Sequence, residues 1–98
     1  MIAIVWRFEV QEEARAAFEA TYGPTGEWAR LFAQADGFRG TELLRAEDRS
    51  YLTLDVWNSQ ADFDAFMAAH REAYEALDRS TEGWTRCEHR LGTYEVME

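Results

Sequence analysis

The chain has 98 residues, of which 47% are apolar, and its 10 arginines and 19 acidic residues leave a net charge of −9. This length predicts one small domain, residues 1–98, and the apolar content argues against disorder. Because an acidic surface repels phosphate groups, we expect neither nucleic acid nor an anionic membrane as a partner.

The first half of the chain predicts a strand followed by an interrupted helix. Residues 2–10 alternate between two faces, and both faces carry apolar side chains, which is typical of a strand. Residues 11–22 place apolar side chains at helical spacing until a Gly-Pro pair interrupts the pattern. Proline fits the first turn of a helix, so we expect Pro24 to begin a second helical piece that includes residues 28–35.

The second half predicts two further strands, a long helix and a last strand. Residues 38–46 and 51–57 are typical of strands that a polar turn joins. Ser59 is placed to cap the next helix, because a serine side chain accepts a hydrogen bond from a backbone N–H of the first turn. That helix is expected to end near Gly83, and residues 85–97 are strand-like.

The order β-α-β-β-α-β predicts an α+β fold, a ferredoxin-like antiparallel sheet with both helices on one face. The other face of that sheet is left uncovered. Since the strand at residues 2–10 carries apolar side chains on both faces, the uncovered face needs a partner. A second copy of the chain is the simplest partner, so we expect a homodimer.

The cysteine content limits the metal chemistry that the chain can support, and its first residues indicate the cellular compartment. Cys87 is the only cysteine, which excludes an intrachain disulfide and a zinc site with several cysteines. Two histidines without suitably spaced carboxylates predict no metal site. The apolar residues 2–6 end at Arg7 and are too few for a signal peptide or a membrane span, so we expect a cytoplasmic protein.

A short motif makes this sequence similar to a known family. Residues 55–59, Asp-Val-Trp-Asn-Ser, end a strand and begin an alanine-rich helix. They resemble the acid-x-Trp-x-Ser motif of the antibiotic biosynthesis monooxygenase-like proteins. The resemblance implies a dimeric α+β barrel, in which two ferredoxin-like chains pack sheet to sheet. It also implies a choice of activities, because members include cofactor-free monooxygenases of phenols and quinols, haem-degrading enzymes and proteins with no known activity.

The sequence departs from that family at positions that matter for chemistry. Many members have a histidine nine residues after the motif tryptophan, where this chain has Phe66. Haem-degrading members have a tryptophan there, a ligand histidine further along the helix and an asparagine on the first strand. The matching positions here are Phe66, Ala76 and Trp6. We therefore expect that haem is not a substrate and that the protein uses no cofactor.

Two functions remain open. The first is a cofactor-independent monooxygenase that oxidises a small aromatic or quinol-like compound with dioxygen. His70 is its expected base, because an imidazole that titrates near neutral pH can take a proton from a phenol. The expected substrate-binding residues are aromatic: Trp6, Tyr22, Trp28, Trp57 and Tyr74. The second function is a non-catalytic dimeric barrel that binds a small hydrophobic ligand, with His70 as an ordinary core residue.

Two residues of the motif also have structural interpretations. Trp57 is more typical of a packing anchor between strand and helix than of a platform for a planar ligand. Asp55 lies on the same face of its strand, and a buried carboxylate needs a partner. We expect that partner to be an arginine of a neighbouring strand, Arg45 or Arg86.

Overall fold

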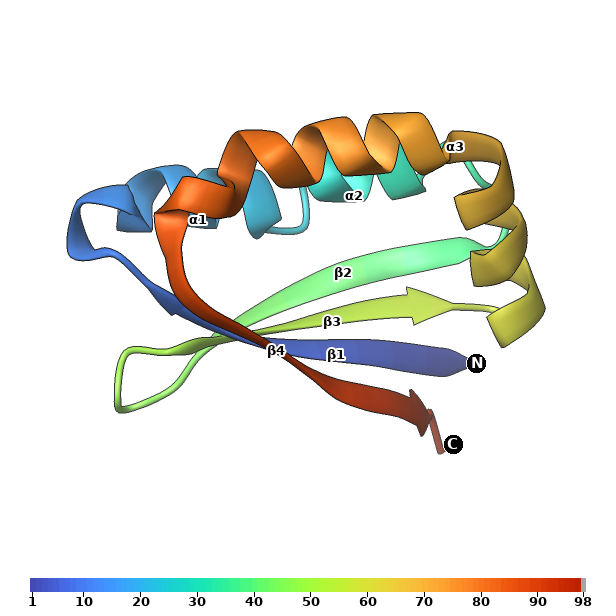
Figure 1. The fold of residues 1–98 in the computed structure, drawn as a ribbon. Helices are drawn as coiled ribbons and strands as arrows, with labels where there is room; N and C mark the ends of the chain where they lie inside the picture. The colour runs from blue at the N-terminus through green and yellow to red at the C-terminus, as the bar shows by residue number, and fades with distance from the viewer. Residues whose placement is uncertain (98) are drawn as a thin grey trace.

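The computed structural model describes residues 1–97. Its elements are β1 (Ile2–Val10), η1 (Glu12–Ala14), α1 (Arg15–Tyr22), α2 (Glu27–Phe32), β2 (Phe38–Arg45), β3 (Tyr51–Trp57), α3 (Gln60–Thr81), η2 (Glu82–Trp84) and β4 (Thr85–Glu95). The strands form one antiparallel sheet in the order β2-β3-β1-β4, with the helices on one side of it (Figure 1). The predicted α+β, ferredoxin-like fold is confirmed.

An aromatic layer between the sheet and the helices forms the core. Phe8 of β1 meets Phe18 of α1 edge to face, with 5.2 Å between the ring centroids. Tyr51, opposite Phe8 in the sheet, packs on the same Phe18 ring. At the other end of β3, Trp57 is 0% exposed and contacts rings from β2, α2 and α3. The environment of Trp57 is that of a packing anchor.

A glycine, rather than the proline, sets the start of the second helical piece. α1 ends at Tyr22 and α2 begins only at Glu27, so the prediction that Pro24 begins that helix is wrong. Gly26 precedes α2 and lies close under α1: a Cβ atom on it would be 2.2 Å from the carbonyl oxygen of Thr21. Only glycine permits this approach, which folds α2 back beside α1.

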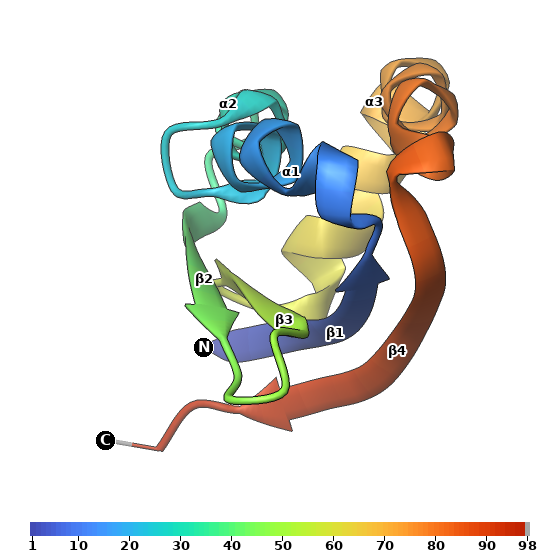
Figure 2. The ribbon, with the colours of Figure 1, turned by 90° about the vertical axis from the view of Figure 1, so that its left-hand side faces the viewer.

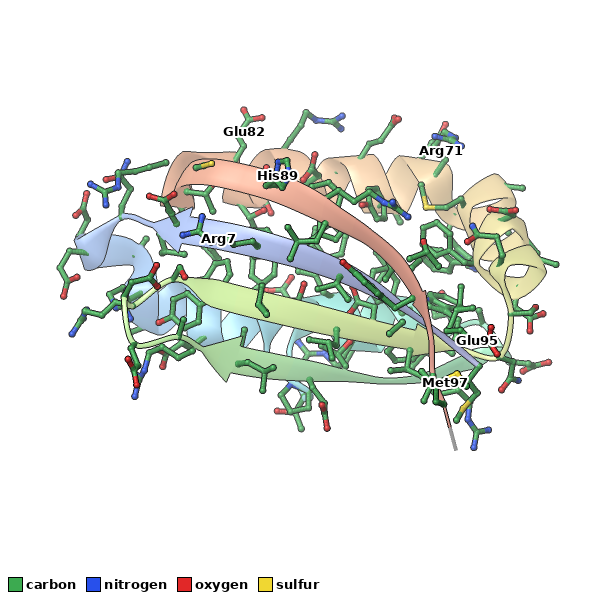
Figure 3. All side chains as sticks on the ribbon, turned by 90° about the horizontal axis from the view of Figure 1, so that it is seen from below. Arg7, Arg71, Glu82, His89, Glu95 and Met97 are labelled. Atoms are coloured by element: carbon green, nitrogen blue, oxygen red, sulfur yellow. The ribbon has the colours of Figure 1, made fainter. Side chains whose placement is uncertain are left out.

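The opposite face of the sheet carries no helix, as the end-on view shows (Figure 2). Leu52 and Leu54 alternate with the inward residues of β3 and therefore point to this open face. Leu44 pairs with Leu52 and is 45% exposed. Seen from this side, Arg7 and His89 are also on the open face (Figure 3). An apolar strip thus crosses a surface that the helices of this chain leave uncovered.

Residues 1–97 include no helix that combines the length and the apolar character needed to cross a membrane.

Ser59 begins α3 as the sequence predicts, and its contribution can be measured. Its Oγ accepts a hydrogen bond from the backbone N–H of Asp62 at 3.2 Å. Ser59→Ala is expected to lower the free energy of unfolding by about 1 kcal/mol, because that N–H loses its acceptor. The matched control is Ser80→Ala at the other end of α3, where the exposed hydroxyl only donates to the carbonyl of Leu77. Chemical denaturation measures both, and equal losses would contradict the capping role.

Candidate active site

A pocket of about 130 Å³ lies between the sheet and the helices. Its walls are aromatic and come from β1, α1, α2 and α3: Trp6, Phe8, Tyr22, Trp28, Phe32 and Tyr74. The polar part of the lining comes from β3, α3 and β4: Thr53, Asp55, Asp78 and Glu88. A dry cavity of about 150 Å³ is enough to hold benzene. The pocket is therefore of the size that accepts a single aromatic ring.

The aromatic walls are held in place by one another. Trp6 and Phe8 occupy the same face of β1, with their rings 6.3 Å apart and 21° from parallel. Trp28 lies between two tyrosines, 5.9 Å from the ring of Tyr22 and 5.0 Å from that of Tyr74. Rings packed at these distances add stability beyond the area they bury, so the walls are preformed.

Asp55 is the innermost carboxylate of the lining. It lies in the middle of β3 and faces Thr41 of β2, whose Oγ1 donates a hydrogen bond to Asp55 Oδ1 at 2.7 Å. The predicted ion pair with Arg45 or Arg86 is wrong: Asp55 has no ion-pair partner among residues 1–97. Arg45 lies opposite Tyr51, at the far end of β3, and its nearest carboxylate is that of Glu19 at 3.7 Å.

The surroundings of Asp55 disfavour its charged form. Burial raises the pKa of Asp55 to about 6, and the hydrogen bond from Thr41 offsets only part of that effect. Asp55 is half-buried and is part of the lining of the pocket. A carboxyl group with a pKa close to neutral is suited to take up a proton and to return it.

The two tyrosines of the pocket are neutral hydroxyl groups at pH 7. Burial raises the pKa of Tyr74 to about 12, and the charges of Asp78 and Asp55 act in the same direction. Burial also raises the pKa of Tyr22, and the hydrogen bond with the Thr81 hydroxyl offsets part of that effect. Tyr74 can donate a hydrogen bond to a ligand, whereas Tyr22 donates its proton to Thr81, because the Thr81 hydroxyl itself donates to the carbonyl of Asp78. Neither tyrosine is a base here.

Four of the five aromatic residues predicted to bind a substrate line this pocket: Trp6, Tyr22, Trp28 and Tyr74. The fifth, Trp57, is completely buried in the core and is not part of the lining.

His70 also lies outside the lining of the pocket. It is half-buried, and its ring stacks on Phe66 with 5.1 Å between centroids. The backbone of α3 leaves helical geometry at His70 (φ −125°, ψ 21°), and the helix bends (Figure 1). The row of inward-facing side chains predicted for a straight helix is therefore interrupted at His70. As a result Tyr74 lines the pocket and His70 does not.

Four polar residues of the lining were not among the predicted site residues: Asp55, which the sequence analysis assigned to a structural ion pair, and Thr53, Asp78 and Glu88. Asp78 follows Tyr74 by four positions on α3, so helical spacing is a signal that could have found it. Glu88 enters because β4 pairs it with Phe8. Its inward direction depends on the register of two strands far apart in the chain, and no local pattern reveals that register. Thr53 lies two positions before Asp55 on β3, so both side chains point to the pocket side of the sheet.

Comparison with known proteins places the chain in a family. A family model described as antibiotic biosynthesis monooxygenase matches residues 1–77, so the chain belongs to this family, as the motif at residues 55–59 predicts. No sequence among the curated proteins matches it.

Three solved structures illustrate the shared fold. A mutant of SnoaB, a cofactor-independent oxygenase from Streptomyces nogalater, is 24% identical, with a TM-score of 0.75 over 99% of this chain and 93% of that one. A mutant of MhuD with manganese protoporphyrin IX bound is 21% identical, with a TM-score of 0.72 over 100% and 96%. Rv0793 from Mycobacterium tuberculosis is 16% identical, with a TM-score of 0.64 over 99% and 95%. At these identities the likeness concerns the fold alone.

The charge of Asp55 is expected to destabilise the protein at neutral pH. Its pKa of about 6 lies above the ordinary 3.8, so the folded state holds the proton more tightly than the unfolded state does. The cost of ionised Asp55 is then about 3 kcal/mol above pH 6 and disappears as the pH falls toward 4. Asp55→Asn keeps an acceptor for Thr41 without the charge, and should therefore raise the melting temperature at pH 8 but hardly at pH 4. The control is Glu72→Gln at the exposed side of α3; an identical change at both pH values in Asp55→Asn would contradict the assignment.

Proposed function

We propose that this protein is a cofactor-independent monooxygenase that oxidises a small aromatic or quinol-like compound with dioxygen. The observation that supports this function is a preformed pocket of about 130 Å³ with aromatic walls and a proton acceptor, Asp55, at its inner end. The substrate ring would lie between Trp6 and the Trp28–Tyr74 pair. Family membership supports the same reaction class.

In this mechanism Asp55 accepts the hydroxyl proton of a bound phenol or quinol. Thr41 holds the carboxylate in place, and Tyr74 and the indole N–H of Trp28 are the donors available to the substrate oxygen. The substrate anion then gives electrons to dioxygen. For a phenol that becomes a quinone, one oxygen atom forms the new carbonyl group. The other leaves as water with the hydrogens of the O–H and C–H bonds, so the substrate supplies all the electrons.

The base is assigned to Asp55 rather than His70 because only Asp55 lines the pocket. Asp55→Asn is expected to lower oxygen uptake with a phenolic or quinol substrate by about 100-fold or more, the usual scale for losing a general base. His70→Ala removes a ring that packs on Phe66, so it should cost about 1–2 kcal/mol of stability and leave turnover per folded molecule within about twofold.

Oxygen consumption and melting temperature, measured on both variants, separate the two candidates. A large loss of turnover in His70→Ala, with Asp55→Asn active, would return the role of base to His70.

The second candidate function is a non-catalytic barrel that binds a small hydrophobic ligand. One observation favours it: the lining carries three carboxyl groups, and their negative charge opposes the formation of a substrate anion. Saturable binding of phenols without any oxygen uptake would support this function over the oxygenase.

We further propose that two copies pack with their open sheet faces together, as a homodimeric barrel. The support is the apolar strip of Leu44, Leu52 and Leu54, which faces away from the helices. Sedimentation at micromolar concentration should give about twice the 11.4 kDa chain mass, and Leu44→Asp should shift the protein toward the monomer because a charge in this strip loses its solvent on association. A monomeric wild-type protein would contradict the proposal.

A further inference from the structure

The charged groups of the pocket are all acidic. Asp55 on β3, Asp78 on α3 and Glu88 on β4 come from three separate elements, and no arginine or histidine belongs to the lining among residues 1–97. Asp55 is half-buried, whereas Asp78 and Glu88 are exposed, and we therefore place these two at the mouth of the pocket. A ligand that enters therefore passes two carboxylates and meets a third.

Outside the pocket, four acidic residues of the described chain form ion pairs with arginines: Glu9, Glu12, Glu19 and Asp48. On the open face Arg7 bonds Glu9 at 2.9 Å, and near α1 Arg49 bonds Glu12 at 3.1 Å. The three pocket acids have no such partner among residues 1–97. Arg90 is beside Trp6 on β4, but its guanidinium donates to Thr93 instead.

The walls between these acids are of a kind that attracts cations. Faces of tryptophan and tyrosine rings are negative and bind ammonium groups, more strongly when water is excluded. Trp6, Trp28 and Tyr74 present such rings within the pocket. Trp28 is only 6% exposed, and its indole N–H makes no hydrogen bond among residues 1–97, so one donor remains for an uncharged oxygen of the ligand.

We propose that the ligand of this pocket is a small aromatic compound that carries both a hydroxyl group and a protonated amine. The inference rests on the proposed function in placing the substrate in this pocket, and it specifies the substrate class. The described residues bring no three potential metal ligands together, so the carboxylates surround the ligand volume instead of converging on one ion. An ammonium group offsets the negative charge and so lowers the pKa of the substrate hydroxyl, which favours proton transfer to Asp55. Anionic aromatic compounds are repelled at the mouth.

The test compares three probes that share one phenol ring and differ in charge: tyramine, 4-ethylphenol and 3-(4-hydroxyphenyl)propanoate. Isothermal titration calorimetry without oxygen, at pH 7.5 and low salt, measures binding to the wild-type protein. Tyramine is expected to bind about tenfold more tightly than 4-ethylphenol, and the carboxylate most weakly. Tyramine that binds no better than 4-ethylphenol, or no binding of any probe at millimolar concentration, would overturn the inference.

Variants then assign the preference to the mouth. Asp78→Asn with Glu88→Gln is expected to bring the two affinities within about threefold. The matched control is Glu72→Gln with Glu75→Gln, which removes the same charge from exposed positions of α3 and should keep the tenfold preference. An equal loss in both pairs would show a general effect of net charge and overturn the assignment to the pocket. The wild-type comparison stands even if the first pair fails to fold.

The binding test and the activity test fail separately. Tight binding of tyramine without oxygen uptake would contradict the oxygenase and leave the charge preference in place. Oxygen uptake that depends on Asp55, without tighter binding of tyramine, would support the oxygenase and contradict the preference for an amine.

Discussion

The inward face of β3 is the feature on which the pocket depends. Large aromatic residues stand at its two ends, Tyr51 and Trp57, and both are almost completely buried against the helices. Between them the face carries only Thr53 and Asp55, which are too short to fill the space between the layers. The aromatic ends thus hold the helices and the sheet together, and the short polar middle leaves the cavity. Close packing around a cavity keeps it open because its walls cannot collapse without losing contacts elsewhere.

The same arrangement explains the chemistry of Asp55. A carboxylate on a strand that faces a core is costly, and the structure lowers this cost with one hydrogen bond from Thr41 instead of a counter-ion. The carboxyl group therefore keeps an elevated pKa at a position that lines the pocket. The close approach of Gly26 to α1 adds the last wall, because it turns α2 back so that Trp28 packs beside Tyr22.

Much of the fold could be predicted because its signals are local. Alternation along residues 2–10, the capping position of Ser59 and the motif at residues 55–59 each depend on neighbours in the sequence, and each matches the structure or the family. The aromatic residues of the pocket were largely predictable for the same reason, since their spacing places them on inward faces. The rest depends on longer-range geometry: the bend at His70 interrupts the row of inward-facing side chains on α3, and the register of β3 against β2 separates Asp55 from Arg45, so the predicted ion pair does not form.

By itself, the sequence determined the order of strands and helices, because that order follows from periodicity, and the motif at residues 55–59 indicated the family. The sequence also predicts that the second sheet face needs a partner. Only the tertiary structure decided which side chains share a cavity. Thr41, Asp55 and Glu88 lie on three strands, and strand pairing alone sets which of them meet the ring of Phe8 or one another. The pKa of Asp55 is decided at the same level, since its burial and its lack of an ion-pair partner among residues 1–97 depend on the folded chain and not on any one segment.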